Sequence, residues 1–194
     1  YAAAIADNER VLGQMAAYYG PPADRLVAIP ALVRVADMSL FQARVERSIR
    51  PPGKRRRWLW YSRVEKMKAS HVLGRLAQMR PSDEFVVYGP LQDSPEALGI
   101  DLPNIHLAGA LKDVMSADLS SFDGYVFTSL FEGLPNAVLE IAQHGLPMVL
   151  SDVGGLKETF SRDDVWFVTM DDNLEATAGS FSASLDEVGM CSEE

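Results

Sequence analysis

The chain has 194 residues, 47% of them hydrophobic and 23% charged, a composition typical of a soluble globular protein with one well-buried domain and an appendage. Its formal net charge of −9 argues against general nucleic-acid binding, because phosphate backbones attract basic surfaces. No apolar run approaches the roughly 20 residues of a membrane helix, and no charged-then-apolar leader opens the chain. A single cysteine excludes an internal disulfide, and no Cys/His cluster has metal-ligand spacing, so we expect a cytoplasmic setting and no metal.

The N-terminal part of the chain predicts two helices separated by a strand. Asp7 or Asn8 is available as N-cap of the first helix, and Gly20 is suited to end it. The predicted elements are a helix over 8–19, a strand over 26–29 and an amphipathic helix over 37–49.

A short basic run, Lys54-Arg55-Arg56-Arg57, follows these elements. Such a run could attract an acidic lipid surface or a phosphorylated acceptor. It could also be a solvated linker ahead of the next strand, and we favour this interpretation because four charges make a short patch.

Short apolar runs then alternate with helical stretches six times from Trp58 to Val168. The predicted strands are 58–61, 84–88, 104–107, 125–127, 148–150 and 165–168. The predicted helices are 71–78, 111–119, 135–144, one from near 156, and 174–188. This alternation predicts an α/β fold with a doubly wound, Rossmann-like parallel sheet. No Gly-x-Gly occurs anywhere, so a nicotinamide-dependent oxidoreductase is disfavoured.

The loop Glu132-Gly133-Leu134 leads from a predicted strand into a helix that we expect to start at Pro135 and to stop at Gly145. Free N–H groups and the positive end of the helix dipole make this point an anion site. Glu132 lies in the loop, and Glu140 lies about 7.5 Å along the helix axis. Because a carboxylate accepts two hydroxyl donors at once, two carboxylates at different depths favour a ligand that carries both phosphate and sugar.

The spacing of Glu132 and Glu140, set in Glu-Gly-Leu-Pro-Asn, resembles the signature of family 4 glycosyltransferases. The following stretches, His144 to Val149 and Asp152-Val153-Gly154-Gly155, add to this resemblance. The family consists of retaining enzymes with the two-Rossmann-domain (GT-B) architecture, and the signature lies in their C-terminal, donor-binding domain. The resemblance covers most of residues 8–190, and it implies that this chain is the C-terminal half of such an enzyme.

The resemblance also assigns roles in the donor site. Arg63 and Lys68 have the spacing of the Arg and Lys that grip the donor pyrophosphate, with Lys66 a weaker candidate for the second role. The usual glycines beside them are replaced by Ser62 and Ala69. An Arg can fork over two phosphate oxygens, while a Lys supplies a mobile point charge.

The remaining roles follow from the same family pattern. Glu132 would contact the transferred sugar and Glu140 the ribose hydroxyls, and Leu111 would pack near the base. Amides of Gly133-Leu134-Pro135-Asn136 would cap the sugar and phosphate. The donor would be a UDP- or GDP-linked sugar, with no cofactor and no obligatory metal. Glu132 could instead be a structural acid at the N-terminus of its own helix.

We expect three segments, namely 1–50 as the end of an N-terminal domain and the interdomain linker, 51–190 as the donor-binding domain, and 191–194 as a tail. In the family, a separate N-terminal Rossmann domain binds the acceptor, which can be a glycan, a lipid or another molecule. We therefore expect a hexosyltransferase fragment that is inactive alone.

Two alternatives remain open. One is a non-catalytic module that keeps the fold for interaction or regulation, suggested by Ser62, Ala69 and the linker residues Ala31 and Leu32, which depart from the family pattern. The other is a related enzyme such as a nucleotide-sugar epimerase, for which we would expect more catalytic acids.

Overall fold

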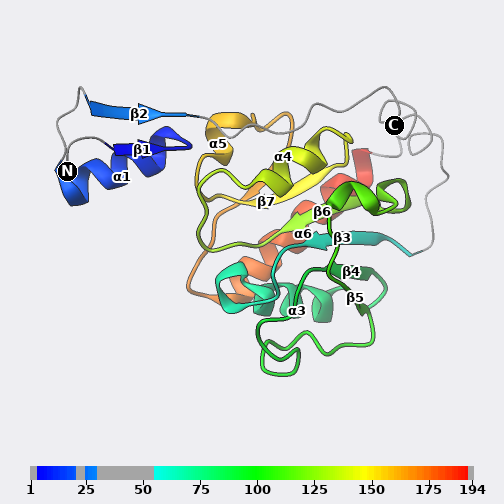
Figure 1. The fold of residues 1–194 in the computed structure, drawn as a ribbon. Helices are drawn as coiled ribbons and strands as arrows, with labels where there is room; N and C mark the ends of the chain where they lie inside the picture. The colour runs from blue at the N-terminus through cyan, green and yellow to red at the C-terminus, as the bar shows by residue number, and fades with distance from the viewer. Residues whose placement is uncertain (1–3, 21–24, 30–54, 192–194) are drawn as a thin grey trace.

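The computed structural model describes residues 4–20, 25–29 and 55–191 (Figure 1). The predicted helix over 37–49, the linker residues Ala31 and Leu32, and Lys54 of the basic run lie outside the described residues. Among the described helices, none combines the length and the apolar character needed to cross a membrane.

Six parallel strands form one sheet, in the order β5-β4-β3-β6-β7-β8 (Figure 1). Their bounds are β3 Arg57–Tyr61, β4 Glu84–Tyr88, β5 Ile105–Gly109, β6 Gly124–Phe127, β7 Met148–Ser151 and β8 Trp166–Val168. Numbered from β3 along the chain, this order is 3-2-1-4-5-6, the arrangement of a doubly wound α/β fold. The predicted Rossmann-like fold is confirmed.

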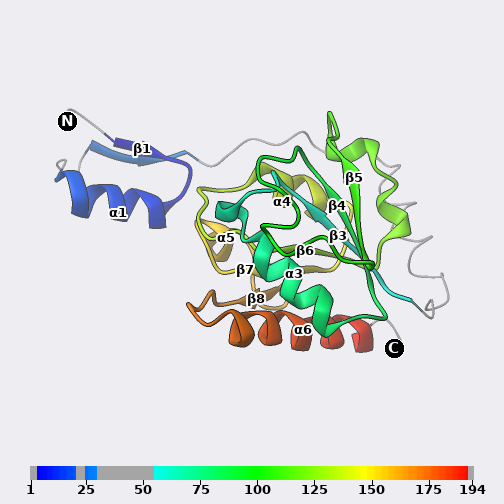
Figure 2. The ribbon, with the colours of Figure 1, turned by 90° about the horizontal axis from the view of Figure 1, so that it is seen from below.

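Helices cover both faces of this sheet. They are α3 Ser70–Met79, α4 Asn136–Ala142, α5 Leu156–Thr159 and α6 Leu174–Cys191. Successive strand residues point to opposite faces, so Trp58 and Trp60 pack in one core cluster with residues of α3 and α6, whereas Leu59 packs in the other with residues of α4 and α5. Figure 2 shows α3 and α6 together on one side of the sheet. The strands are therefore buried on both faces, as their continuous apolar runs indicated.

A small N-terminal unit lies beside this sheet domain in both ribbon views (Figures 1 and 2). It consists of β1 Ala4–Ala6, α1 Glu9–Tyr19 and β2 Leu26–Ala28, with β1 and β2 paired in parallel. The side chain of Asn8 caps α1, and Gly20 ends it in the left-handed conformation with φ of 64°. The predicted helix and strand are confirmed, whereas the sequence analysis missed β1, which is only three residues long.

The predicted helix over 111–119 is wrong. The chain forms two short 3₁₀ turns there, Val114–Ser116 and Leu119–Ser121. Ser116 Oγ donates to the Asp113 carbonyl at 2.6 Å, and Ser121 Oγ donates to the Asp118 carbonyl at 2.8 Å. These local bonds offer the backbone an alternative to a continuous helix.

Helix α4 is shorter than the predicted range from Pro135 to His144. Pro135 is its N-cap, with an extended backbone (φ −71°, ψ 114°), rather than its first helical residue. The expected left-handed residue is present, because Gly145 has φ of 60°, although the helix itself ends at Ala142. The first helical residue is therefore Asn136.

Candidate functional site

The order of the strands in the sheet reverses between β3 and β6, which are neighbours although they are far apart in the chain. Ligands of open α/β sheets bind at the carboxyl ends of the strands that flank such a reversal. The segment after β3 carries Arg63 and Lys68, and the segment after β6 carries Glu132. The fold therefore brings the predicted site residues of two separate motifs to one point.

A cavity of about 290 Å³ lies at this point. It is lined by Tyr61, Ser62, Arg63, Lys68, Gly89, Pro90, Leu111, Phe127, Glu132, Pro135, Asn136 and Ala137. Six of the predicted site residues are in this lining, namely Arg63, Lys68, Leu111, Glu132, Pro135 and Asn136. Gly133, Leu134 and Glu140 are not.

Lys68 and Glu132 form a salt bridge at the wall of the cavity. Both side chains are largely buried, with exposed fractions of 14% and 16%. The same carboxylate oxygen of Glu132 accepts a hydrogen bond from Ser129 Oγ at 2.7 Å. The Glu132 side chain is thus bound across the site to Lys68, in the segment after β3, and to Ser129, rather than to the N-terminus of its own helix.

Further hydrogen bonds hold the two segments together behind this pair. Trp60 Nε1 donates to Thr128 Oγ1 at 3.0 Å, and Thr128 Oγ1 donates to the Lys68 carbonyl at 2.7 Å. The Leu130 N–H donates to the Met67 carbonyl at 3.0 Å. Since the backbone of Lys68 is fixed from the core side, its ammonium group is pre-positioned at the cavity.

Arg63 contrasts with Lys68. Its side chain is 60% exposed and forms a salt bridge of 3.1 Å with Glu65. It lines the cavity from the solvent side. A guanidinium group in this position can rotate between Glu65 and an anionic ligand, because an exposed ion pair contributes little stability.

Glu140 lies on α4, where it is partly buried, and its negative charge interacts with Tyr61, which lines the cavity. The pKa of Tyr61 is raised, first by burial of the phenol and then by the negative charges of Glu140 and Asp113. Tyr61 was not predicted as a site residue. Its position as the last residue of β3, directly before Ser62 and Arg63, could have indicated that it lies at the site.

The N–H of Leu134 has a partner from the N-terminal unit. It donates to Asp7 Oδ2 at 2.7 Å, and the carbonyl of Gly133 accepts from the Gly155 N–H at 2.9 Å. Sequence analysis considered Asp7 only as a helix cap. Its contact with Leu134 spans 127 positions, so no local pattern could indicate it.

Two departures from the family pattern are accommodated by the backbone. Ala69 has φ of 48°, the left-handed conformation that explains a glycine in the family at this position. Gly89 has φ of 151°, and a Cβ there would lie 1.7 Å from the Ser62 carbonyl oxygen. The tight approach beside Ser62 is therefore provided by Gly89.

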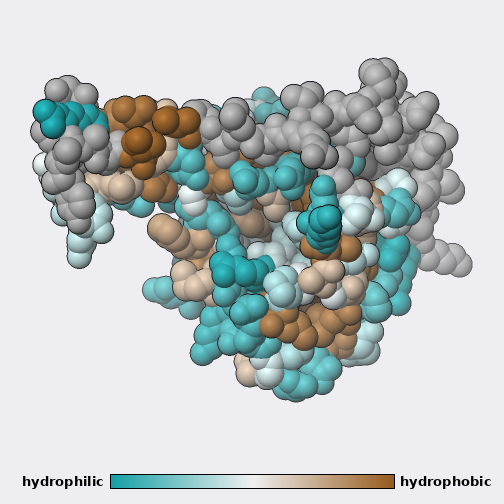
Figure 3. Space-filling model, in the orientation of Figure 1, coloured by the Kyte–Doolittle hydropathy of each residue, from teal (hydrophilic) through white to brown (hydrophobic). Residues whose placement is uncertain are grey.

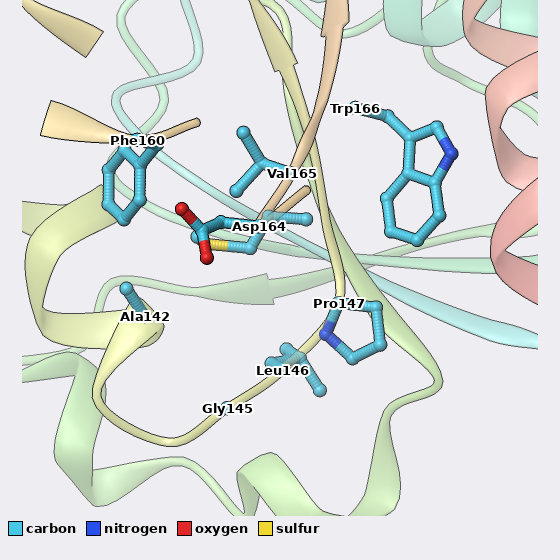
Figure 4. Close-up of a pocket in the computed structure, with 9 residues that line it drawn as sticks. Ala142, Gly145, Leu146, Pro147, Phe160, Asp164, Val165 and Trp166 are labelled. Atoms are coloured by element: carbon cyan, nitrogen blue, oxygen red, sulfur yellow. The ribbon is translucent and has the colours of Figure 1, made fainter. Parts of the chain in front are cut away.

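A second cavity, of about 390 Å³, lies at the opposite edge of the sheet (Figure 4). It is formed at the amino ends of β7 and β8, where Pro147, Phe160 and Trp166 contribute to a mainly apolar lining. Asp164 is the only carboxylate among the described residues of that lining, and its pKa is lowered because Ser161 donates hydrogen bonds to it through both its side chain and its backbone. None of the described residues that line this cavity is a Lys or an Arg, in contrast to the first one. Within the described ranges, no three His, Cys, Asp or Glu residues are grouped to hold a metal ion.

The family model for glycosyl transferases group 1 matches residues 55–186. The chain therefore belongs to this family of glycosyltransferases. The match spans the whole sheet domain from the approach to β3 into α6.

Individual relatives agree with this assignment. An N,N'-diacetylbacillosaminyl-diphospho-undecaprenol alpha-1,3-N-acetylgalactosaminyltransferase from Campylobacter jejuni is 29% identical over 118 residues, which are 58% of this chain and 30% of the relative. The Vi polysaccharide biosynthesis protein VipC/TviE from Salmonella typhi is 34% identical over 92 residues, 44% of this chain and 16% of the relative.

The structure of HepE from Anabaena in complex with UDP and glucose superimposes with a TM-score of 0.68 at 16% identity. The superposition covers 98% of this chain and 55% of HepE. The chain thus corresponds to about half the length of this GT-B structure, and to smaller shares of the two curated relatives.

Proposed function

We propose that this chain is the donor-binding half of a retaining glycosyltransferase that takes a hexose from a UDP- or GDP-linked donor. The observation that carries this proposal is the cavity at the strand-order reversal, which unites Arg63, Lys68, Glu132 and Leu111. HepE, which has the same fold, holds UDP and glucose in its structure.

The diphosphate would lie against the two cations of the segment after β3. Arg63 is exposed and can leave Glu65 to form two parallel hydrogen bonds with phosphate oxygens. Lys68 is held by its backbone and supplies a fixed positive charge. Together they stabilise the negative charge that develops on the leaving nucleotide, which is the main catalytic contribution expected of such a site.

The sugar would lie beside Glu132, whose carboxylate accepts hydrogen bonds from Lys68 and Ser129 on one oxygen. The other carboxylate oxygen of Glu132 can then accept a hydrogen bond from a sugar hydroxyl. The nucleoside would lie toward Leu111 and Tyr61, with the ribose near Glu140. No metal ion is required, because the leaving-group charge is met by side chains.

The acceptor would bind to a second domain on the N-terminal side. The small unit of β1, α1 and β2 supports this proposal, because a two-stranded parallel pair is not a stable sheet by itself and is typical of the end of a larger one. The Campylobacter jejuni relative, which acts on a diphospho-undecaprenol-linked sugar, and the Vi polysaccharide biosynthesis protein support a glycan or lipid-linked acceptor and a part in polysaccharide biosynthesis.

Calorimetric titration with UDP, GDP and ADP, and with their sugar conjugates, tests the donor site. We expect one base to be selected, with binding weakened about tenfold or more in Arg63→Ala and in Glu140→Ala, since each change removes a charged hydrogen-bonding partner. The matched controls are Arg162→Ala and Glu96→Ala, which alter exposed residues away from the cavity. Failure of the wild type to bind any nucleotide would favour the non-catalytic module.

A further inference from the structure

The N-terminal unit meets the sheet domain at a short turn, Asp7-Asn8, which follows the carboxyl end of β1. Asp7 accepts the Leu134 N–H on Oδ2 and the Asn8 side-chain amide on Oδ1, at 2.7 and 2.6 Å. Asn8 is only 4% exposed, and its own Oδ1 caps α1 by accepting the Val11 N–H at 2.8 Å. The turn is thus fixed both to its own helix and to the loop that carries Glu132.

The Asp7-Asn8 turn packs against the backbone of two glycines. A Cβ on Gly133 would lie 2.3 Å from Asp7 Oδ2, and a Cβ on Gly155 would lie 2.4 Å from the Asn8 Cβ. The two glycines are joined by the hydrogen bond from the Gly155 N–H to the Gly133 carbonyl. The Asp7-Asn8 turn thus fills the space that side chains on these two glycines would occupy.

Hydrogen bonds from the backbone of α1 and one salt bridge hold the same unit in place. The Glu158 carboxylate accepts the N–H groups of Glu9 and Arg10 at 2.8 and 2.7 Å. The Arg10 guanidinium lies 3.2 Å from Asp152 Oδ1. The position of Asp7 therefore does not depend on its bond to Leu134 alone.

The loop after β6 separates the donor cavity from a third cavity of about 490 Å³. Glu132 lines the donor cavity, whereas Phe131, Gly133 and Asp7 line the third one. Asp7 thus contacts the loop from the side opposite to the donor. It is in position to fix the loop and not to touch the sugar.

We propose that Asp7 is a positioning residue for the sugar-binding end of the donor site. By holding the Leu134 N–H, it fixes the peptide next to Glu132 and so the place at which the sugar hydroxyls bind. The nucleotide end of the site is built from Arg63, Lys68 and Leu111, on other segments that Asp7 does not contact. This inference rests on the proposed function, and it predicts that loss of Asp7 weakens binding of the sugar more than binding of the nucleotide.

The first test compares the binding of UDP and of UDP-glucose by calorimetry. Asp7→Ala should raise the ratio of the UDP-glucose Kd to the UDP Kd by about tenfold, because the loop loses a charge-assisted hydrogen bond. Asp7→Asn should restore the wild-type ratio, since its amide oxygen still accepts the Leu134 N–H. If Asp7 acted through its charge on the donor, both variants would shift binding of UDP itself.

Hydrogen exchange of the Leu134 amide provides a second readout that needs no ligand. Exchange should be faster in Asp7→Ala than in the wild type and in the control Asp172→Ala, which changes an exposed turn before α6. An unchanged Kd ratio or an unchanged exchange rate in Asp7→Ala overturns the proposal. A wild type that binds none of UDP, GDP and their sugar conjugates refutes the proposed function, and this inference with it; if GDP is the nucleotide selected, the same ratio is measured with GDP and GDP-glucose.

Discussion

Gly154 has neither the space nor the backbone conformation for a side chain. Its φ is 56°, and a Cβ there would lie 1.9 Å from the carbonyl oxygen of Gly133. The turn after β7 therefore depends on this glycine to approach the loop that carries Glu132. The close contact links the stability of the fold to the shape of the donor site.

Gly154→Ala should destabilise the protein by about 2 kcal/mol or more, because it combines backbone strain with a steric overlap against fixed backbone. Urea unfolding measures this loss. The matched control is Gly179→Ala in α6, where a Cβ meets no atom within 4 Å, and helix propensity predicts a gain of up to about 1 kcal/mol. Equal urea midpoints for Gly154→Ala and the wild type would contradict the clash.

The family resemblance pointed to Arg63, Lys68 and Glu132, and the fold brings all three to one cavity because each lies in a segment that follows the carboxyl end of a strand. Asp7 and Tyr61 were missed for different reasons. Asp7 acts through a contact with a distant loop, and Tyr61 was interpreted only as a strand residue. Sequence patterns thus indicated site residues from the segment in which each residue lies, but they did not indicate contacts with distant segments.

The N-terminus of α1 shows the same limit for a whole element. The free N–H groups of its first turn are bound partly by the Asn8 side chain, which the sequence indicated, and partly by Glu158 of α5, which the sequence did not indicate. The strands were predicted to within a residue or two because each is a continuous apolar run. The prediction for 111–119 failed because the Ser116 and Ser121 hydroxyls bond to nearby backbone carbonyls, and apolar content alone does not reveal this competition.

Glu158→Ala should loosen α1 without unfolding the sheet. The change removes two hydrogen bonds to the helix N-terminus, which are together worth about 1 kcal/mol at an exposed position. Hydrogen exchange should accelerate over residues 9–12 and stay unchanged in α3. Glu96→Ala is the control for loss of an exposed carboxylate, and equal exchange in both variants would argue that α1 does not depend on Glu158.

At the scale of the whole molecule, the N-terminal unit has an exposed apolar surface. Figure 3 shows a hydrophobic patch over its strands, where Ile5, Val27 and Ile29 are 63%, 45% and 55% exposed. Such a patch on a two-stranded sheet is typical of a surface that another layer covers. This agrees with the proposal that an acceptor domain completes the enzyme on this side.

If, as proposed, the acceptor binds to a second domain, the chain alone should bind the donor nucleotide but transfer no sugar. The measurement is transfer of labelled glucose from UDP-glucose to lipid and polysaccharide extracts, with a full-length protein that contains this chain as the positive control. Transfer by the chain alone would refute the need for a second domain.

The contacts of the N-terminal unit also bear on the order in which the chain acquires its structure. Arg10 meets Asp152 across 142 positions, and Glu9 meets Glu158 across 149. A ribosome that synthesises the chain from its N-terminus releases α1 long before α5 exists. The turn at Asp7 can therefore pack against the sheet domain only after nearly the whole sheet has been synthesised. Its docking is a late step of folding.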